Sequence, residues 1–149
     1  MGEPQTIHVD QFLPYPPARV WRALTDPDLL SRWLMPNDFH LEVGHRFTFR
    51  RPPIRKIDFD GTIECEVLDF EAERMLRISW GGGGLDTTVT WWLQPEGRGT
   101  RLLVEHAGFD LDDPVQDFAF RGMGSGWPNI GRGIAAVLAA EDNFVGHHP

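Results

Sequence analysis

Residues 88–106, TVTWWLQPEGRGTRLLVEH, contain two runs of alternating apolar and polar side chains, joined by a segment rich in glycine and proline. Alternation with a period of two places one set of side chains on each face of a β-strand, and residues 95–99 have the composition of a turn. The side chains expected on the buried face are Val89, Trp91, Leu93, Leu102, Val104 and His106. The stretch therefore predicts two antiparallel strands that cover one core.

The same alternation extends toward the N-terminus as far as residue 42. Further strands are predicted at 47–49, 61–68 and 76–80. Because each predicted strand has one apolar face, residues 42–106 indicate an antiparallel meander rather than a parallel sheet. The glycines at 81–84 predict a flexible hairpin tip that could cover a cavity mouth, since they lack the lysine and the following helix of a phosphate-binding loop.

Helical patterns lie on both sides of the meander. A first strand over residues 7–13 precedes two short helices that begin at Pro17 and Pro27, because proline suits the first turn of a helix. Near the C-terminus, apolar residues at steps of three and four predict a long helix over residues 127–141, which needs a sheet to cover. Residues 115–123 are ambiguous, because three glycines follow closely behind two phenylalanines.

Composition and charge exclude several classes of protein. The 149 residues suit one domain over 1–149, and the formal net charge of −8 argues against nucleic acid or a membrane surface as the main partner. No run approaches the roughly 20 apolar residues of a membrane span, and the first residues lack the pattern of a secretory signal. Cys65 is the single cysteine, so we expect no disulfide and a cytoplasmic protein. The histidines lack metal-binding spacing, so we expect no metal and no cofactor.

Short motifs spread over nearly the whole chain carry a resemblance to a known family. They are VWRALTDP at 20–27 with RW at 32–33, VGHRF at 43–47, residues 61–68, SW at 79–80, GTRL at 99–102 with EH at 105–106, and GWP at 126–128. In this order they resemble the family homologous to the activator of Hsp90 ATPase, within the START-like (SRPBCC) superfamily. The resemblance implies an α+β helix-grip fold, in which a curved antiparallel sheet wraps around a long C-terminal helix, with two short helices after the first strand.

Aromatic side chains dominate the predicted interior. A sheet curved around one helix tends to leave a cleft, and aromatic walls with few polar anchors suit a small apolar ligand. The expected ligand-binding residues are Trp33, Phe47, Phe49, Trp80, Trp91, His106, Phe109 and Trp127, with His106 as the hydrogen-bonding anchor. The alternative is that these side chains fill the cleft and that His106 is a core residue satisfied by a backbone carbonyl.

Binding of a small apolar or aromatic molecule in this cleft is the expected function, by a module with weak enzymatic activity or none. Members of the superfamily serve as lipid carriers, hormone receptors, polyketide cyclases and cochaperones, so the resemblance assigns no chemistry. A cochaperone or protein-interaction role is one alternative. A cyclase or hydrolase acting in the same cleft is another, but it would need an acid and a base, and we assign no catalytic residue. Trp92 is expected to face outward, which favours a homodimer.

Overall fold

A sheet of six antiparallel strands forms one layer of the protein, in the order β1-β6-β5-β4-β3-β2. The computed structural model describes residues 4–146. The strands are β1 (Gln5–Leu13), β2 (Arg46–Arg50), β3 (Thr62–Glu71), β4 (Met75–Gly82), β5 (Leu85–Glu96) and β6 (Gly99–Phe109). The strands from β2 to β6 therefore form the meander that the alternation predicts, and β1 pairs with its last strand.

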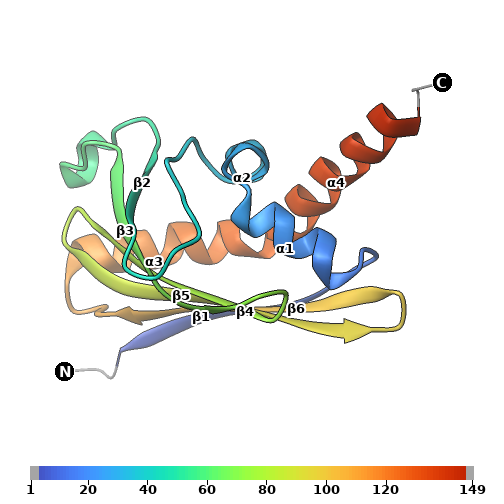
Figure 1. Cartoon of the computed structure of the whole chain (residues 1–149). Coiled ribbons are helices and arrows are strands. Elements are labelled where there is room, and N and C mark those ends of the chain that lie inside the picture. Colours follow the sequence, from blue (N-terminus) through green and yellow to red (C-terminus); the bar gives the residue numbers. More distant parts are fainter. Residues whose placement is uncertain (1–3, 147–149) are drawn as a thin grey trace.

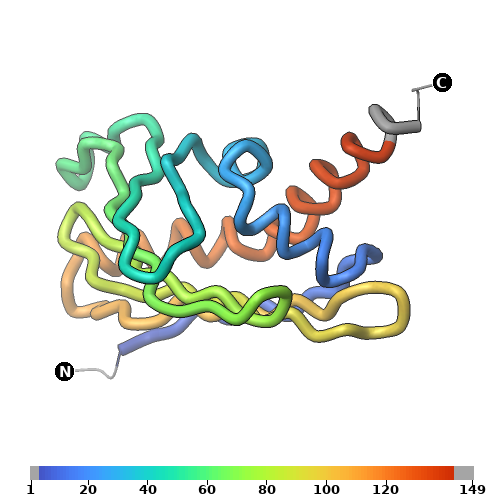
Figure 2. Tube along the Cα trace, in the orientation of Figure 1, coloured from blue at the N-terminus to red at the C-terminus, as the bar shows by residue number. Residues whose placement is uncertain are grey.

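The helices form the second layer, on one side of this sheet. They are α1 (Pro17–Thr25), α2 (Pro27–Trp33), α3 (Pro114–Gly126) and α4 (Ile130–Gly146), with short 3₁₀ turns η1 (Arg55–Ile57) and η2 (Trp127–Asn129). In Figure 1, α3 crosses the face of the sheet, while α1 and α2 lie beside α4. The end of the sheet that carries β2 and β3 curves up around α3 (Figures 1 and 2). This is the predicted helix-grip architecture.

The strand register confirms the burial expected from residues 88–106. Trp91 lies opposite Val104, and Val89 lies opposite His106. Their side chains and those of Leu93 and Leu102 are all buried. The period of two therefore identified the face that packs against the helices.

Proline and aspartate start the two short helices. Pro27 occupies the first turn of α2, where its missing N–H costs nothing, and the Asp26 carboxylate accepts hydrogen bonds from the N–H groups of Asp28 and Leu29 at 2.9 and 3.5 Å. At the other end of α2, the indole Nε1 of Trp33 donates to the carbonyl of Ala23 at 2.7 Å. This bond ties α2 to α1 and fixes the orientation of Trp33.

The C-terminal helical segment begins earlier than the sequence predicts. Instead of starting at Trp127, it starts at Pro114, where Asp113 accepts a hydrogen bond from the N–H of Val115 at 2.9 Å. The glycines at 122, 124 and 126 lie inside α3, and the helix tightens to a 3₁₀ turn only at residues 127–129. Glycine lowers helix stability by about 1 kcal/mol relative to alanine but does not forbid the conformation. The Asp113 cap and the contacts of Ala119, Phe120 and Met123 with the core offset that cost.

The length and hydropathy of a helix decide whether it can cross a membrane. Within residues 4–146, no helix is both long and apolar enough to cross a membrane.

Candidate functional site

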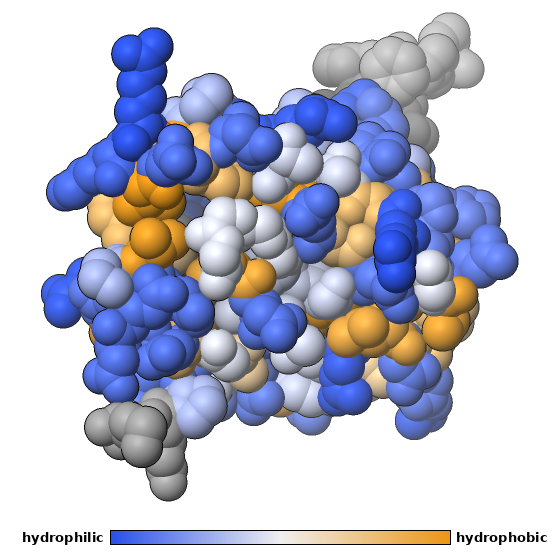
Figure 3. Space-filling model, turned by 90° about the vertical axis from the view of Figure 1, so that its left-hand side faces the viewer, coloured by the Kyte–Doolittle hydropathy of each residue, from blue (hydrophilic) through white to orange (hydrophobic). Residues whose placement is uncertain are grey.

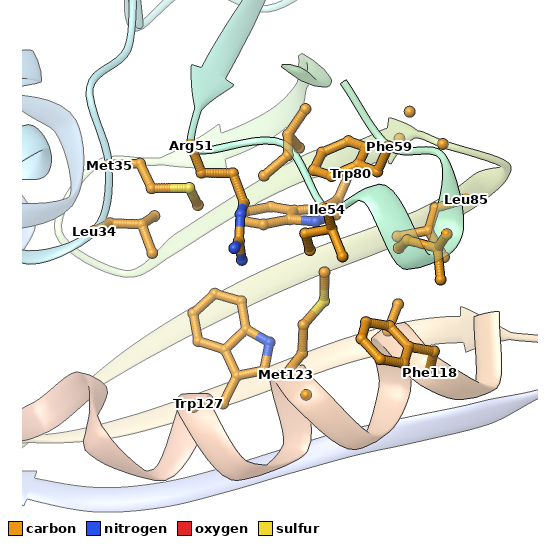
Figure 4. A pocket seen from close by; sticks show the side chains of 18 of the residues that line it. Leu34, Met35, Arg51, Ile54, Phe59, Trp80, Leu85, Phe118, Met123 and Trp127 are labelled. Carbon is orange, nitrogen blue, oxygen red and sulfur yellow. The ribbon is translucent and has the colours of Figure 1, made fainter. Parts of the chain in front are cut away.

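A cavity of about 610 Å³ lies between α3, the curved end of the sheet and the loop that connects β2 to β3. Figure 4 shows its walls, where side chains from the loop and the sheet point toward those of α3 and η2. The lining residues labelled there are Leu34, Met35, Arg51, Ile54, Phe59, Trp80, Leu85, Phe118, Met123 and Trp127. Most of them are apolar or aromatic, so the cavity offers a ligand a largely hydrophobic surface.

One stripe of α3 and η2 forms the helical wall of the cavity. Its members recur at helical spacing: Val115, Phe118, Ala119, Gly122, Met123, Gly126 and Trp127. A Cβ atom added at Gly122 or Gly126 would meet nothing within 4 Å. Gly122 and Gly126 therefore place no side chain in the cavity, which helps to keep this space open.

The turn between β4 and β5 forms another wall of the cavity. Gly82, Gly83 and Gly84 have φ values of +100°, +63° and +92°, which residues with side chains rarely adopt. A Cβ atom on Gly82 would lie 2.7 Å from the carbonyl oxygen of Thr62. The glycines therefore form a hairpin tip, as predicted, and Gly82 and Gly83 line the cavity.

The loop from residue 51 to residue 61 covers the cavity from the side of β2. Ile54 and Phe59 exchange backbone hydrogen bonds of 2.9 and 3.0 Å, which close the loop and bring both side chains over the sheet. At its base, the N–H of Arg51 donates to the carbonyl of Gly61 at 2.9 Å. Gly61 has φ +96°, and a Cβ there would collide with the backbone oxygen of Arg51. Gly61 is thus required for the position of Arg51.

Arg51 brings a positive charge to a wall that is otherwise apolar. Its Nε donates to the carbonyl of Pro52 at 3.1 Å, and Figure 4 shows the guanidinium pointing toward Trp127. Among the described residues that line the cavity, Asn129 is the other one with a polar side chain apart from the tryptophans. The face of the molecule with the β4–β5 turn shows apolar surface among hydrophilic surface (Figure 3).

The structure separates the predicted site residues into two groups. Trp33, Trp80 and Trp127 line the cavity. The others are buried behind the wall: Phe47, Phe49, Trp91, His106 and Phe109. This second group supports the first through ring contacts, such as the 5.3 Å between the centroids of Phe49 and Trp80. The sequence pattern thus identified the inward face, but not which part of that face stays open.

His106 is fully buried, and both of its ring nitrogens bind other parts of the protein. The indole Nε1 of Trp127 donates to Nδ1 at 3.0 Å, so the neutral ring carries its proton on Nε2. Nε2 then donates to the hydroxyl of Thr87 at 2.8 Å, which donates to the carbonyl of Trp80 at 2.7 Å. Burial lowers the pKa of His106 to about 3. Instead of facing the cleft as a ligand anchor, His106 holds two tryptophans of the cavity wall.

Two further buried groups bear on the chemistry of the site. Burial raises the pKa of the Cys65 thiol, which lies outside the cavity lining, so the thiol stays neutral. The indole Nε1 of Trp80 is buried without a hydrogen-bond partner among the described residues. Across residues 4–146, no group of three or more histidine, cysteine or acidic side chains could hold a metal ion.

Comparisons with known proteins agree with this architecture. A family model described as "Activator of Hsp90 ATPase homolog 1-like protein" matches residues 14–139. No curated protein matches the chain. Among solved structures, protein MLL2253 from Mesorhizobium loti is 35% identical with a TM-score of 0.80, over 91% of this chain and 98% of that one. CalU16 from Micromonospora echinospora is 28% identical with a TM-score of 0.73, over 92% and 76%. BH1534 from Bacillus halodurans is 25% identical with a TM-score of 0.73, over 89% and 96%.

Proposed function

We propose that this chain, which belongs to the Activator of Hsp90 ATPase homolog 1-like family, binds a small apolar or aromatic molecule in the cavity beside α3. The observation that carries the proposal is the cavity itself, about 610 Å³ with mostly apolar walls. Sites for small molecules in proteins commonly enclose roughly 300–1,000 Å³ and have such walls. Burial of an apolar ligand there would gain roughly 25 cal/mol for each Å² removed from water.

The lining favours binding over acid–base catalysis. General acid–base chemistry needs a group that can exchange a proton within hydrogen-bond reach of the substrate. Among the described residues that line the cavity, none carries a carboxylate, imidazole, thiol or hydroxyl group. His106, the nearest candidate from the sequence, lies behind Trp127 with both ring nitrogens engaged. A cyclase or hydrolase reaction in this cavity therefore has less support than simple binding.

Titration with N-phenyl-1-naphthylamine, an apolar dye that fluoresces in dry surroundings, tests the proposal. We expect saturable binding with one site per chain. Gly122→Phe places a ring where a Cβ meets open space on the cavity side of α3, and it should raise the Kd by about tenfold or more because the ring occupies the cavity.

The matched control is Gly124→Phe. Gly124 lies in the same helix, lacks close neighbours and does not line the cavity. This variant should bind the dye with a Kd close to that of the wild type, and thermal melts of both variants confirm that they fold. The proposal would be contradicted if the wild-type protein showed no saturable binding of the dye, or if both variants lost the same amount of affinity for it.

A cochaperone role is the alternative that the family description suggests. Stimulation of an Hsp90 ATPase would involve the acidic surface of a chain with a net charge of −8, and it should weaken as salt screens the charges. An ATPase assay at low salt separates the two functions, since a small-molecule carrier should give no stimulation.

A further inference from the structure

The charge distribution around the cavity differs from that of the whole chain. The chain has 22 acidic residues against 14 basic ones. The segment RRPPIRK, residues 50–56, contains Arg50, Arg51, Arg55 and Lys56 but no acidic residue. It leads from the end of β2 into the loop that covers the cavity. A cationic segment therefore borders the cavity of an acidic protein.

These cations have no carboxylate partners among the described residues. Among the described residues, the arginines that form ion pairs with carboxylates are other ones, including Arg19, Arg22 and Arg101. Arg51 uses its Nε on a backbone carbonyl, and Lys56 lies over the ring of Phe118, 5.4 Å from the ring centroid. Phe118 and Arg51 both line the cavity. Of the four cationic groups, Arg51 therefore forms part of the wall, and Lys56 contacts the wall through Phe118.

We propose that the cavity is selective for apolar or aromatic molecules that carry one anionic group, with the anion paired to Arg51. This inference rests on the proposed function and specifies its ligand class. An arginine with free N–H groups presents a planar fork that matches the oxygens of a carboxylate or sulfonate. The apolar body of such a ligand lies against Trp80, Trp127 and Met123, which line the same cavity as Arg51 (Figure 4).

The orientation of the ligand follows from the exposure of Arg51. The side chain is exposed to solvent although its guanidinium points toward Trp127, so the anionic group sits at the mouth and keeps part of its hydration. A fully buried charge would need much stronger compensation. The geometry therefore suits an amphipathic acid that enters with its apolar end first.

The test compares two dyes with the same ring skeleton. 1-Anilinonaphthalene-8-sulfonate carries a sulfonate, whereas N-phenyl-1-naphthylamine is neutral. Arg51→Gln should raise the Kd of the sulfonate about fivefold, which is the upper range for a partly exposed ion pair, and should change the Kd of the neutral dye by less than about twofold. The difference should shrink at high salt, because exposed charge pairs are screened.

Arg98→Gln is the matched control, because it makes the same change in net charge in the turn between β5 and β6, away from the cavity lining. It should leave both affinities close to those of the wild type. An equal loss of affinity for the sulfonate dye in Arg51→Gln and Arg98→Gln would mean that only net charge matters, and it would overturn the inference. Binding of both dyes without any effect of Arg51→Gln would overturn it too, but leave the proposed function standing. Binding of neither dye by the wild type would overturn both.

Discussion

His106 shows how one residue connects the core to the cavity. Its ring is surrounded by Trp80, Phe109, Trp127 and Thr87, and burial among these neighbours is what lowers its pKa. Protonation would place a hydrogen on Nδ1, directly opposite the indole N–H of Trp127. Desolvation and the loss of this hydrogen bond both oppose the charged form, so the folded protein holds the imidazole neutral.

The free energy of unfolding should therefore depend on pH through His106. The folded pKa is about 3, while an unfolded histidine titrates near about 6.5. Between these values the unfolded chain binds one more proton, so the stabilisation is complete above the unfolded pKa and declines as the pH falls. From about pH 7.5 to about 5.5 the loss should be about 1.4 kcal/mol.

Denaturant titrations of the wild type and of His106→Gln at these two pH values measure the effect. Glutamine offers a donor and an acceptor but does not titrate. Between the two pH values, the unfolding free energy of the variant should therefore fall by about 1.4 kcal/mol less than that of the wild type. Nitrogen chemical shifts of the imidazole provide a check that does not depend on the variant folding. A ring that is protonated in the folded protein at pH 5.5 would contradict this account.

Particular residues explain how much of the site the sequence predicts. Trp80 and Trp127 could be placed on the inward face because strand and helix periods are visible in the sequence. Arg51 and Phe59 could not be placed from the sequence, because they belong to a loop without periodicity. Only the backbone hydrogen bonds of this loop bring it over the sheet. The one available signal was the cationic segment beside Pro52 and Pro53.

At the scale of elements, the glycines of α3 and of the β4–β5 turn have opposite roles. Gly124 has ordinary helical geometry and open space around it, whereas Gly82 has φ +100° and a backbone oxygen close to where a Cβ would lie. The helix glycines weaken α3 beside the cavity. The turn glycines permit the conformation that closes the hairpin.

Alanine substitutions should separate these roles. Gly124→Ala should stabilise the protein by about 0.5–1 kcal/mol, because alanine favours the helix. Gly82→Ala should destabilise it by more than about 1 kcal/mol, because the new methyl group meets Thr62 in a strained conformation. Thermal melts should show the shifts as roughly 2–4 °C per kcal/mol. A Gly82→Ala protein as stable as the wild type would refute the strain argument.

The strength of the local sequence pattern explains which elements the sequence predicts well. The strands of the meander follow from alternation, because a two-sided sheet imposes it on every strand. The sequence leaves residues 115–123 ambiguous, because helix propensity is low where Gly122, Gly124 and Gly126 lie close together. The Asp113–Pro114 cap is a start signal in the sequence, and it outweighs those glycines in the folded protein.

At the scale of the whole molecule, the outer face of the sheet is the surface on which we expect self-association. Trp92 lies opposite Met75 on β4 and Leu103 on β6, so an apolar row crosses the face that the helices leave uncovered. Its side chain is half-buried in the isolated chain. Tryptophan at such a position is a frequent anchor of protein interfaces.

Sedimentation at micromolar concentration tests this expectation. The wild type should sediment as a dimer, and Trp92→Ala should shift the equilibrium toward the monomer because the interface loses a large apolar side chain. The Arg98→Gln variant serves as a surface control and should stay dimeric. A wild-type protein that sediments as a monomer at all concentrations would exclude the dimer.

Nuclear magnetic resonance of the six tryptophan indole N–H groups during titration with N-phenyl-1-naphthylamine tests the central claim most directly. Trp33, Trp80 and Trp127 line the cavity, whereas Trp21 and Trp92 do not. We predict saturable shifts of the first three signals and much smaller changes for the other two. Shifts centred on Trp21 or Trp92, or no saturable shift of any indole signal, would contradict a ligand-binding cavity beside α3.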